Sequence, residues 1–185
     1  EKTEHGWVWA HAYQFDEDTA TVIVECSGET WDKFGFNDMS KEQTIAACEE
    51  IFADYLGGHE LISNAKHLRG SSVWMNFPRV ICGKWHHENI VLMGDAAATG
   101  HFSIGSGTRL AFDSAISLAS YLHSESSLQT AFERYQDERR LEVLRLQSAA
   151  RNSLEWFEDV ERYVDFDPVQ FNYALLTRSQ RISHE

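Results

Sequence analysis

The chain has 185 residues, of which 43% are apolar and 24% are charged, and its formal net charge is −13 at pH 7. These values are typical of a soluble globular protein and argue against a disordered chain or a fibrous repeat. An acidic chain without a basic stripe is not expected to bind nucleic acid. No apolar run approaches the roughly 20 residues of a membrane-spanning helix, so no membrane contact is expected. Three cysteines without a C-x-x-C motif, Cys26, Cys48 and Cys82, predict a reduced, cytoplasmic protein.

The first half of the chain predicts a sheet with one helix. Large and small residues alternate over residues 7–15, and a β-branched segment, 19–26, follows an acidic turn; this pattern is typical of an antiparallel hairpin. A Ser-x-x-Gln capping box begins a helix at Ser40, which a glycine pair ends at Gly57. Renewed alternation over residues 71–77 predicts a further strand that ends before a proline.

The second half predicts a strand, a glycine-rich loop and helices. The apolar run 89–93 leads into a Gly-Asp pair and is typical of a buried strand before a functional loop. Alanine and leucine recur at helical spacing over residues 108–122. A second capping box, at Ser126, predicts the start of a long charged helix. We expect Pro168 to mark a break before a final polar segment.

Together these elements predict an α/β fold of mixed α+β type. We expect a mixed sheet with one helix in residues 1–88, a strand–loop–helix portion in 89–125 and a helical segment in 126–185. Because the chain begins at Glu1 without a methionine or an apolar leader, we interpret it as a domain fragment.

The segment 89–115 carries the chemistry of the chain. It places an acid, Asp95, at the end of the predicted strand, then a glycine-rich loop and a helix N-terminus. Ligands of α/β folds bind beyond the carboxyl ends of strands, and helix N-termini offer N–H groups to negative charge. An anionic or polarised cofactor is therefore expected here, although a tight connection without a ligand is an alternative.

Three familiar enzyme classes do not fit this segment. A haloacid-dehalogenase-like phosphatase needs Asp-x-Asp-x-Thr/Val, and Ala20 occupies the last position after the acids of residues 16–18. A serine hydrolase needs Gly-x-Ser-x-Gly, whereas Ser106 has a glycine on each side. An NTPase needs Gly-x-x-x-x-Gly-Lys-Ser/Thr, which the sequence lacks.

A fourth class fits. Gly-Asp-Ala-Ala at 94–97, Gly-Ser-Gly at 105–107 and the alanine-rich helix 111–115 resemble the second flavin-binding motif of para-hydroxybenzoate-hydroxylase-like flavoprotein monooxygenases. More narrowly, HFSIGSGTRLA (101–111) and LLTRSQRISHE (175–185) resemble the group of salicylyl-CoA 5-hydroxylase and 2-aminobenzoyl-CoA monooxygenase. The chain lacks the Gly-x-Gly-x-x-Gly motif of the first βαβ unit. The resemblance therefore implies the C-terminal half of an FAD monooxygenase domain.

Two residues depart from the pattern of these enzymes. Ala98 stands where many of them have a histidine, and Thr108 stands where many have an asparagine. The resemblance still implies a substrate-domain portion in 1–88, a flavin-binding portion in 89–125 and a helical tail.

The implied function is an FAD-dependent, NAD(P)H-using aromatic hydroxylase that acts on an aromatic acyl-CoA. The chain alone is expected to be inactive, to need the missing N-terminal half as its partner and to self-associate through uncovered faces. A truncated, non-catalytic flavoprotein-like binding or assembly domain is the alternative.

The resemblance also implies the residues that bind the cofactor. Asp95 would accept a hydrogen bond from a ribityl hydroxyl of FAD, because a carboxylate only accepts. Backbone N–H groups at the helix start would face the pyrimidine end of the isoalloxazine ring, where reduced flavin is negative. The implied cofactor-binding residues are Gly94, Asp95, Ala96, Gly105, Ser106, Gly107, Thr108 and Arg109.

The substrate side is assigned to the loop and to one strand face. His101 is the candidate catalytic residue, because an imidazole can relay the proton of a phenol or aniline; a histidine that caps loop carbonyls is the alternative. Phe102 and Ser103 flank it, and Trp74 and Asn76 share a predicted strand face that would line the aromatic pocket or simply pack in the core.

A local concentration of basic residues would suit the phosphates of CoA, with a solvated surface as the alternative. Its members are Lys66, His67, Arg69, Arg79, Lys84, His86 and His87. Cys82 with the adjacent histidines lacks a fourth ligand, so no metal site is predicted.

Overall fold

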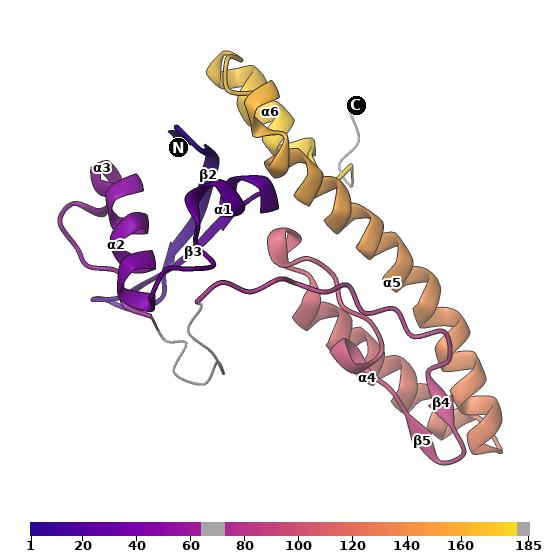
Figure 1. The fold of residues 1–185 in the computed structure, drawn as a ribbon. Coiled ribbons are helices and arrows are strands. Elements are labelled where there is room, and N and C mark those ends of the chain that lie inside the picture. Colours follow the sequence, from indigo (N-terminus) through magenta and orange to yellow (C-terminus); the bar gives the residue numbers. More distant parts are fainter. Residues whose placement is uncertain (64–72, 181–185) are drawn as a thin grey trace. The chain divides into compact units, whose positions relative to one another are not determined.

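The computed structural model describes residues 1–63 and 73–180. The chain divides into two compact units, Glu1–Asn76 and Phe77–Glu185. In Figure 1 the first unit is coloured from indigo to purple and the second from magenta to yellow. Each unit is described by itself.

A three-stranded antiparallel sheet forms the first unit. Its strands lie in the order β1 (Lys2–Thr3), β2 (Gly6–Gln14) and β3 (Ala20–Cys26). The register pairs Val8 with Cys26 at one end and Gln14 with Ala20 at the other. The predicted hairpin is therefore confirmed, and period-two alternation buries Val8 completely.

Three helices follow the sheet. α1 (Gly28–Phe34), which the sequence analysis did not predict, starts at an N-cap serine and ends at a glycine in the left-handed region. α2 (Lys41–Ile51) has the predicted capping box, with both reciprocal hydrogen bonds present. After a break at Phe52, α3 (Ala53–Leu56) ends at Gly57, whose φ is 58°.

The strand predicted over residues 71–77 is not found in its described part. Residues 71 and 72 lie outside the described residues, and 73–77 form no strand. The indole of Trp74 instead packs against Phe36, with ring centroids 4.7 Å apart. No strand pairs with residues 73–77 in the described part of the chain, so period two alone predicted the wrong structure there.

The second unit begins with a short hairpin. β4 (His86–His87) pairs antiparallel with β5 (Ile90–Val91), and Glu88 between them has a φ of 51°. The buried strand predicted over 89–93 is wrong in length and burial, because two residues are paired and Ile90 is 63% exposed. Two 3-10 turns, η2 (Gly94–Ala96) and η3 (Phe102–Ile104), lead into α4 (Gly107–Ser124), which confirms the helix predicted over 108–122.

Long helices complete the second unit. α5 (Leu128–Glu158) confirms the predicted long helix, but its cap is Ser127, whose hydroxyl accepts from the Thr130 N–H; the predicted capping box at Ser126 is wrong. After η4 (Val160–Arg162), α6 (Pro168–Thr177) begins at the proline. The predicted break is present between the end of α5 and Pro168, and since proline fits the first turn of a helix, the final segment begins as a helix at that residue.

The core of the second unit lies between α4, α5 and the hairpin. Its buried members are Trp85, Ala97, Ala98, Leu110, Tyr135 and Val143. The Tyr135 hydroxyl donates to the Leu92 carbonyl, and an isolated bridge joins Ile81 to Ala98. Ala98, which replaces a histidine common in the resembling enzymes, is thus a core residue. The predicted mixed α/β class is confirmed, and every strand pair in the described residues is antiparallel.

Among the helices of residues 1–63 and 73–180, none combines the length and the apolar character that a membrane crossing requires.

Candidate functional site

A cleft of about 1190 Å³ opens in the second unit. Three segments line it: the stretch 77–80, the loop between β5 and α4, and one face of α5. The structure brings eight of the predicted site residues to this cleft: Gly94, Asp95, His101, Phe102, Gly105, Ser106, Gly107 and Thr108.

Gly94 and Asp95 form the acidic edge of the cleft. Gly94 has a φ of 58°, and a Cβ at this position would lie 3.3 Å from the Cβ of Ala111, so the turn can press against α4 only with glycine. The next residue, Asp95, is exposed and lines the cleft. Its carboxylate makes no hydrogen bond or ion pair with another described residue, so its oxygens are available to a hydroxyl donor.

The N-terminus of α4 points its backbone at the same cleft. Gly105 takes a φ of 62° and ends η3, and the N-cap residue Ser106 makes no side-chain cap bond. The Ser106 hydroxyl donates instead to the carbonyl of Ile104, at 3.2 Å. Because no side chain caps this helix, its first N–H groups, which carry positive partial charge, can receive an anionic or polarised group. Gly107 and Thr108 line the cleft at this point.

An aromatic cluster forms another part of the lining. The rings of His101 and Phe102 stack with centroids 4.5 Å apart, and Phe77 lies 5.1 Å from Phe102. The Ser103 N–H donates to Nδ1 of His101 at 3.3 Å. An imidazole nitrogen that accepts a hydrogen bond carries no proton, so the neutral His101 ring is protonated at Nε2. Phe77, which precedes Pro78 at the end of the predicted strand, also lines the cleft and was not predicted as a site residue.

The face of α5 on the cleft was also missed. Gln147, Arg151 and Leu154 recur at i, i+4 and i+7, which places them on one side of the helix. Gln147 is 3% exposed, and its side-chain amide donates to the Thr99 carbonyl at 2.7 Å and to the Val80 carbonyl at 3.0 Å. A polar residue among the apolar positions of a long helix is the sequence signal that could have identified this face.

Five predicted residues do not line the cleft. Ala96 is exposed, and the Arg109 side chain pairs with Asp113 at 3.6 Å on the surface of α4. Ser103 has a buried hydroxyl without a partner among the described residues. Trp74 and Asn76 belong to the other unit, and their predicted shared strand face does not exist.

The predicted basic concentration is not one surface. Lys66, His67 and Arg69 lie outside the described residues, whereas Arg79 lines the cleft. Lys84 and His87 are exposed but His86 is buried, 6.0 Å from the Phe132 ring. Within residues 1–63 and 73–180, no three His, Cys, Asp or Glu side chains are grouped to hold a metal ion.

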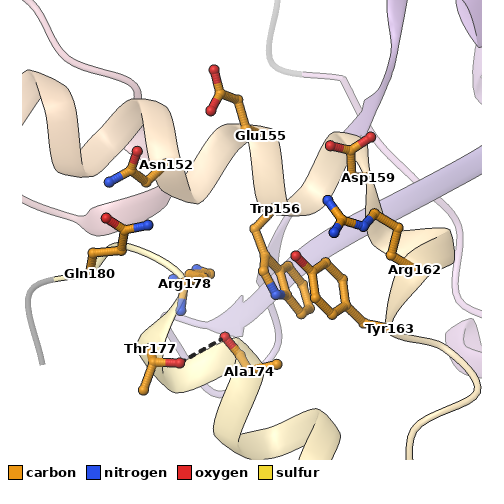
Figure 2. A pocket seen from close by; sticks show the side chains of 10 residues that line it. All are labelled: Asn152, Glu155, Trp156, Asp159, Arg162, Tyr163, Ala174, Thr177, Arg178 and Gln180. Carbon is orange, nitrogen blue, oxygen red and sulfur yellow. Dashed lines mark hydrogen bonds between the residues drawn. The ribbon is translucent and has the colours of Figure 1, made fainter. Parts of the chain in front are cut away.

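A second cavity of about 380 Å³ involves α5, the segment after it and α6. Figure 2 shows its side chains, among which the rings of Trp156 and Tyr163 stack with centroids 4.8 Å apart. Arg178 lies at this cavity too, and none of the predicted site residues does.

Comparison with known proteins shows that the chain is similar to parts of monooxygenases. It is 39% identical over 186 residues to a salicyloyl-CoA 5-hydroxylase of a Streptomyces species, covering 95% of this chain and 35% of that protein. It is 38% identical over 182 residues to a 3-hydroxy-4-methyl-anthranilyl-[aryl-carrier protein] 5-monooxygenase of Streptosporangium sibiricum, covering 98% and 46%. The chain is homologous to part of these monooxygenases. The resemblance predicted from the sequence is thereby confirmed.

The fold comparison agrees. The crystal structure of PqsL, described as a probable FAD-dependent monooxygenase from Pseudomonas aeruginosa, matches with a TM-score of 0.59 at 19% identity, over 92% of this chain and 44% of that one. The chain therefore has the fold of part of that protein and spans less than half the length of these monooxygenases. No protein-family model matches it.

Proposed function

We propose that this chain forms part of an FAD-dependent monooxygenase that hydroxylates an aromatic substrate, and that its cleft receives the isoalloxazine ring. The observation that carries the proposal is the meeting of Asp95 and the uncapped start of α4 at one cleft. The relatives at 38% and 39% identity, both named for oxygenation of aromatic acyl groups, support it.

The residues present fit such a cofactor. A cleft of about 1190 Å³ has room for a flavin ring, since ligand pockets of about 300–1,000 Å³ bury most of a drug-sized molecule. At one edge of the cleft, the Asp95 carboxylate offers hydrogen-bond acceptors. At the start of α4, the N–H groups before Leu110 favour a negative group, which suits a ring that becomes negative on reduction. The cleft thus has an acceptor for the ribityl chain of the flavin and donors for the pyrimidine end of its ring.

When bound, FAD would supply the activation of dioxygen for transfer of one oxygen atom to an electron-rich ring, with NAD(P)H as the reductant. The chain would supply positions. Asp95 would fix a ribityl hydroxyl, and the backbone of residues 107–109 would bind the pyrimidine end. His101, protonated at Nε2 when neutral, would exchange a proton with a substrate hydroxyl or amine, beside the ring of Phe102.

The substrate that we propose is an aromatic acid held as a thioester, with CoA as the carrier. Arg79 and Arg151 line the cleft, and guanidinium groups bind phosphates in bidentate fashion. The two relatives are named for different carriers, CoA and an aryl-carrier protein, so the carrier is the part of this proposal that most needs a direct test.

The division into portions and the partners are proposals as well. We assign residues 1–88 to substrate binding, 89–125 to flavin binding and 126–185 to a helical tail, in a cytoplasmic protein. The outer face of α4 exposes Phe112 (65%) and Ile116 (69%), one turn apart. These two side chains would pack against the N-terminal half of the flavin domain. Where that half is absent, they would promote self-association of the chain.

The experiment compares Asp95→Asn with Asp137→Asn in the protein that contains this chain. Asp137 is an exposed acid on α5 away from the cleft, so it is the matched control. We expect the Kd for FAD, measured by quenching of flavin fluorescence, to rise about tenfold or more in Asp95→Asn, because a hydrogen bond to a charged group contributes about 1.5–3 kcal/mol. The control should leave it unchanged.

Product analysis then tests the reaction. Salicylate and 2-aminobenzoate are supplied free and as CoA thioesters with FAD and NADH or NADPH, and hydroxylated products are detected by mass spectrometry. Thioester-dependent hydroxylation is the expected result. Unchanged FAD affinity in Asp95→Asn would contradict the proposed flavin contact, and FAD binding without oxygenation would favour a non-catalytic binding domain.

A further inference from the structure

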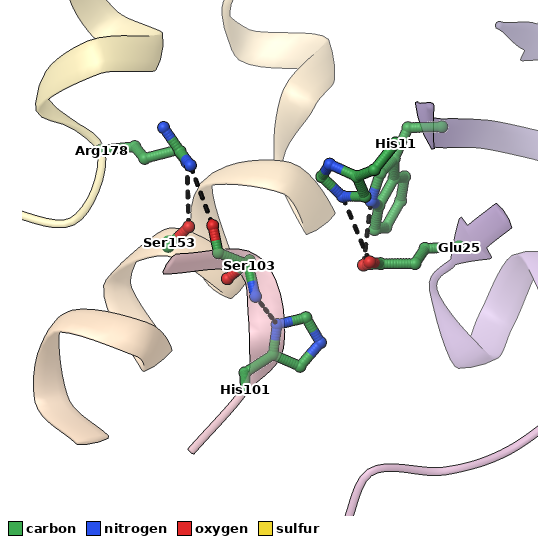
Figure 3. A network of polar contacts seen from close by, with 7 residues as sticks. His11, Glu25, His101, Ser103, Ser153 and Arg178 are labelled. Carbon is green, nitrogen blue, oxygen red and sulfur yellow. Dashed lines mark hydrogen bonds and ion pairs between the residues drawn. The ribbon is translucent and has the colours of Figure 1, made fainter. Parts of the chain in front are cut away.

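Arg178, just after α6, makes three hydrogen bonds inside the second unit. Its Nε donates to the Ser153 hydroxyl at 2.9 Å, and its Nη2 donates to the Ser103 carbonyl at 2.9 Å (Figure 3). Its Nη1 donates to the carbonyl of Leu175. The same guanidinium lies over the ring of Phe157, 5.3 Å from the centroid. These contacts join three segments that are far apart in the sequence: η3, α5 and the end of α6.

The surroundings of the guanidinium are pre-formed and partly dry. Ser153 is fully buried, so the hydroxyl that orients Arg178 is itself fixed in the α5 core. Burial lowers the pKa of Arg178 from its ordinary value, but an arginine keeps its charge in proteins. A charged donor in such a place makes stronger hydrogen bonds than a solvated one.

Ser103 transmits this contact to the cleft. Its carbonyl accepts from Arg178, and its N–H donates to Nδ1 of His101. Both backbone groups of one residue therefore connect the arginine with the imidazole. Next to it, the Gly105 N–H closes η3 on the carbonyl of Phe102 at 2.8 Å, directly before α4 begins.

The loop is held at its other end by a different side chain. Gln147 binds the carbonyls of Val80 and Thr99, before His101. Arg178 binds after His101, so the histidine lies between two anchored points. Without the second anchor, the short turn that carries His101 and Phe102 would keep its contacts with α5 but lose a fixed orientation of the Ser103 peptide.

We propose that Arg178 is a positioning residue of the cleft, which acts through the Ser103 peptide to orient His101 and the turn before α4. The effect of Arg178 on hydroxylation rests on the proposed function, whereas its anchoring of the turn does not. The arginine of the segment LLTRSQ thus acts on the cleft from outside it, because Arg178 lines the second cavity and not the cleft itself.

Hydrogen–deuterium exchange of Arg178→Met tests the anchoring. Arg162→Met is the matched control, because Arg162 also lies over an aromatic ring, that of Tyr163 at 5.8 Å, and makes no contact with the loop. We expect amides of residues 101–105 to exchange about tenfold faster in Arg178→Met, since a charged hydrogen bond is lost. Residues 85–92 should keep their protection, and the control should change neither region.

Arg178→Lys guards against a folding defect. A single ammonium keeps the charge but cannot serve three acceptors in a planar fork, so we expect protection of 101–105 to return in part. Equal loss of protection over the whole second unit, or no change at 101–105, would overturn the proposal. In the protein with bound FAD, Arg178→Met should also shift the flavin absorption spectrum. Wild-type protein that fails to bind FAD would contradict the proposed function but leave the exchange result valid.

Discussion

Partly buried polar side chains are satisfied in different ways at the sheet of the first unit and at the loop of the second. In the first unit, side chains pair with each other across strands. Glu25 contacts Nε2 of His11 at 3.2 Å (Figure 3). It also accepts from the Trp9 indole at 3.0 Å. In the second unit, side chains of α5 and of the segment after α6 donate to backbone carbonyls of a loop, as Gln147 and Arg178 do.

The difference follows from the backbone. Paired strands satisfy their own N–H and C=O groups, so their side chains are free to pair with one another. An irregular loop leaves carbonyls that need donors from elsewhere, and each unsatisfied buried one costs about 1–3 kcal/mol. The anchor Gln147 lies on the face of α5 that lines the cleft, so the cleft is bounded by the loop and by the helix that holds it. A candidate site is therefore expected in the second unit.

The largest effect that we predict concerns the thiols of the first unit. Burial raises the pKa of Cys48 to about 11 and that of Cys26 to about 12, from an ordinary value of 9.0. At pH 8 both should react with a chromogenic disulfide reagent about a hundredfold or more slower in the folded chain than in urea, because thiolate is the reactive form. A Cys82→Ser background removes the thiol of the second unit from the measurement.

The same shifts fix the sign of a pH dependence. Since the folded-state pKa values of Cys26 and Cys48 are raised, the unfolded chain loses these protons first, above about pH 9. The two thiols should therefore leave the free energy of unfolding of the first unit unchanged below about pH 9 and lower it between pH 9 and about 12. Equal thiol reactivity in the folded and unfolded chain would show that this unit is not closed around its cysteines.

The second prediction removes an anchor. Gln147→Leu leaves the Thr99 and Val80 carbonyls without their side-chain donor, in a place that is 3% exposed. We expect the free energy of unfolding, measured in urea, to fall by about 2–4 kcal/mol. Gln129→Leu, an exposed glutamine on the same helix, is the control and should change it by less than about 0.5 kcal/mol. A loss as small as that of the control would remove the distinction between the units.

Local signals in the sequence predicted the regular elements well. The hairpin of residues 7–26, the capping box at Ser40 and the helix after Gly107 depend on neighbours in the chain, and all are confirmed. The strand predicted over 71–77 is absent from its described part, 73–77, because a strand needs a partner, which alternation does not reveal. The cap at Ser127 rather than Ser126 shows that adjacent serines cannot be separated by pattern alone.

The candidate site was predicted from one side only. The motif residues at 94–95 and 105–108 meet at the cleft because they flank one short loop. The opposite wall comes from α5, some 40 residues later in the chain, and only tertiary packing brings Gln147 and Arg151 there. The charged residues of α5 are not all solvated either, because Arg139 is 8% exposed and lies 3.8 Å from Asp113.

The smallest predicted effect is the coupling between His11 and Glu25. Their side chains are 27% and 12% exposed, so the pair is only partly desolvated, and cross-strand pairs contribute about 0.2–1 kcal/mol. A double-mutant cycle of His11→Phe and Glu25→Gln isolates it, because glutamine can still accept from the Trp9 indole. The exposed helical pair Glu29–Lys33 is the control, because solvent screens its coupling. A coupling of His11 with Glu25 that exceeds the loss in Gln147→Leu would reverse the comparison, since paired side chains would then stabilise the protein more than anchored carbonyls.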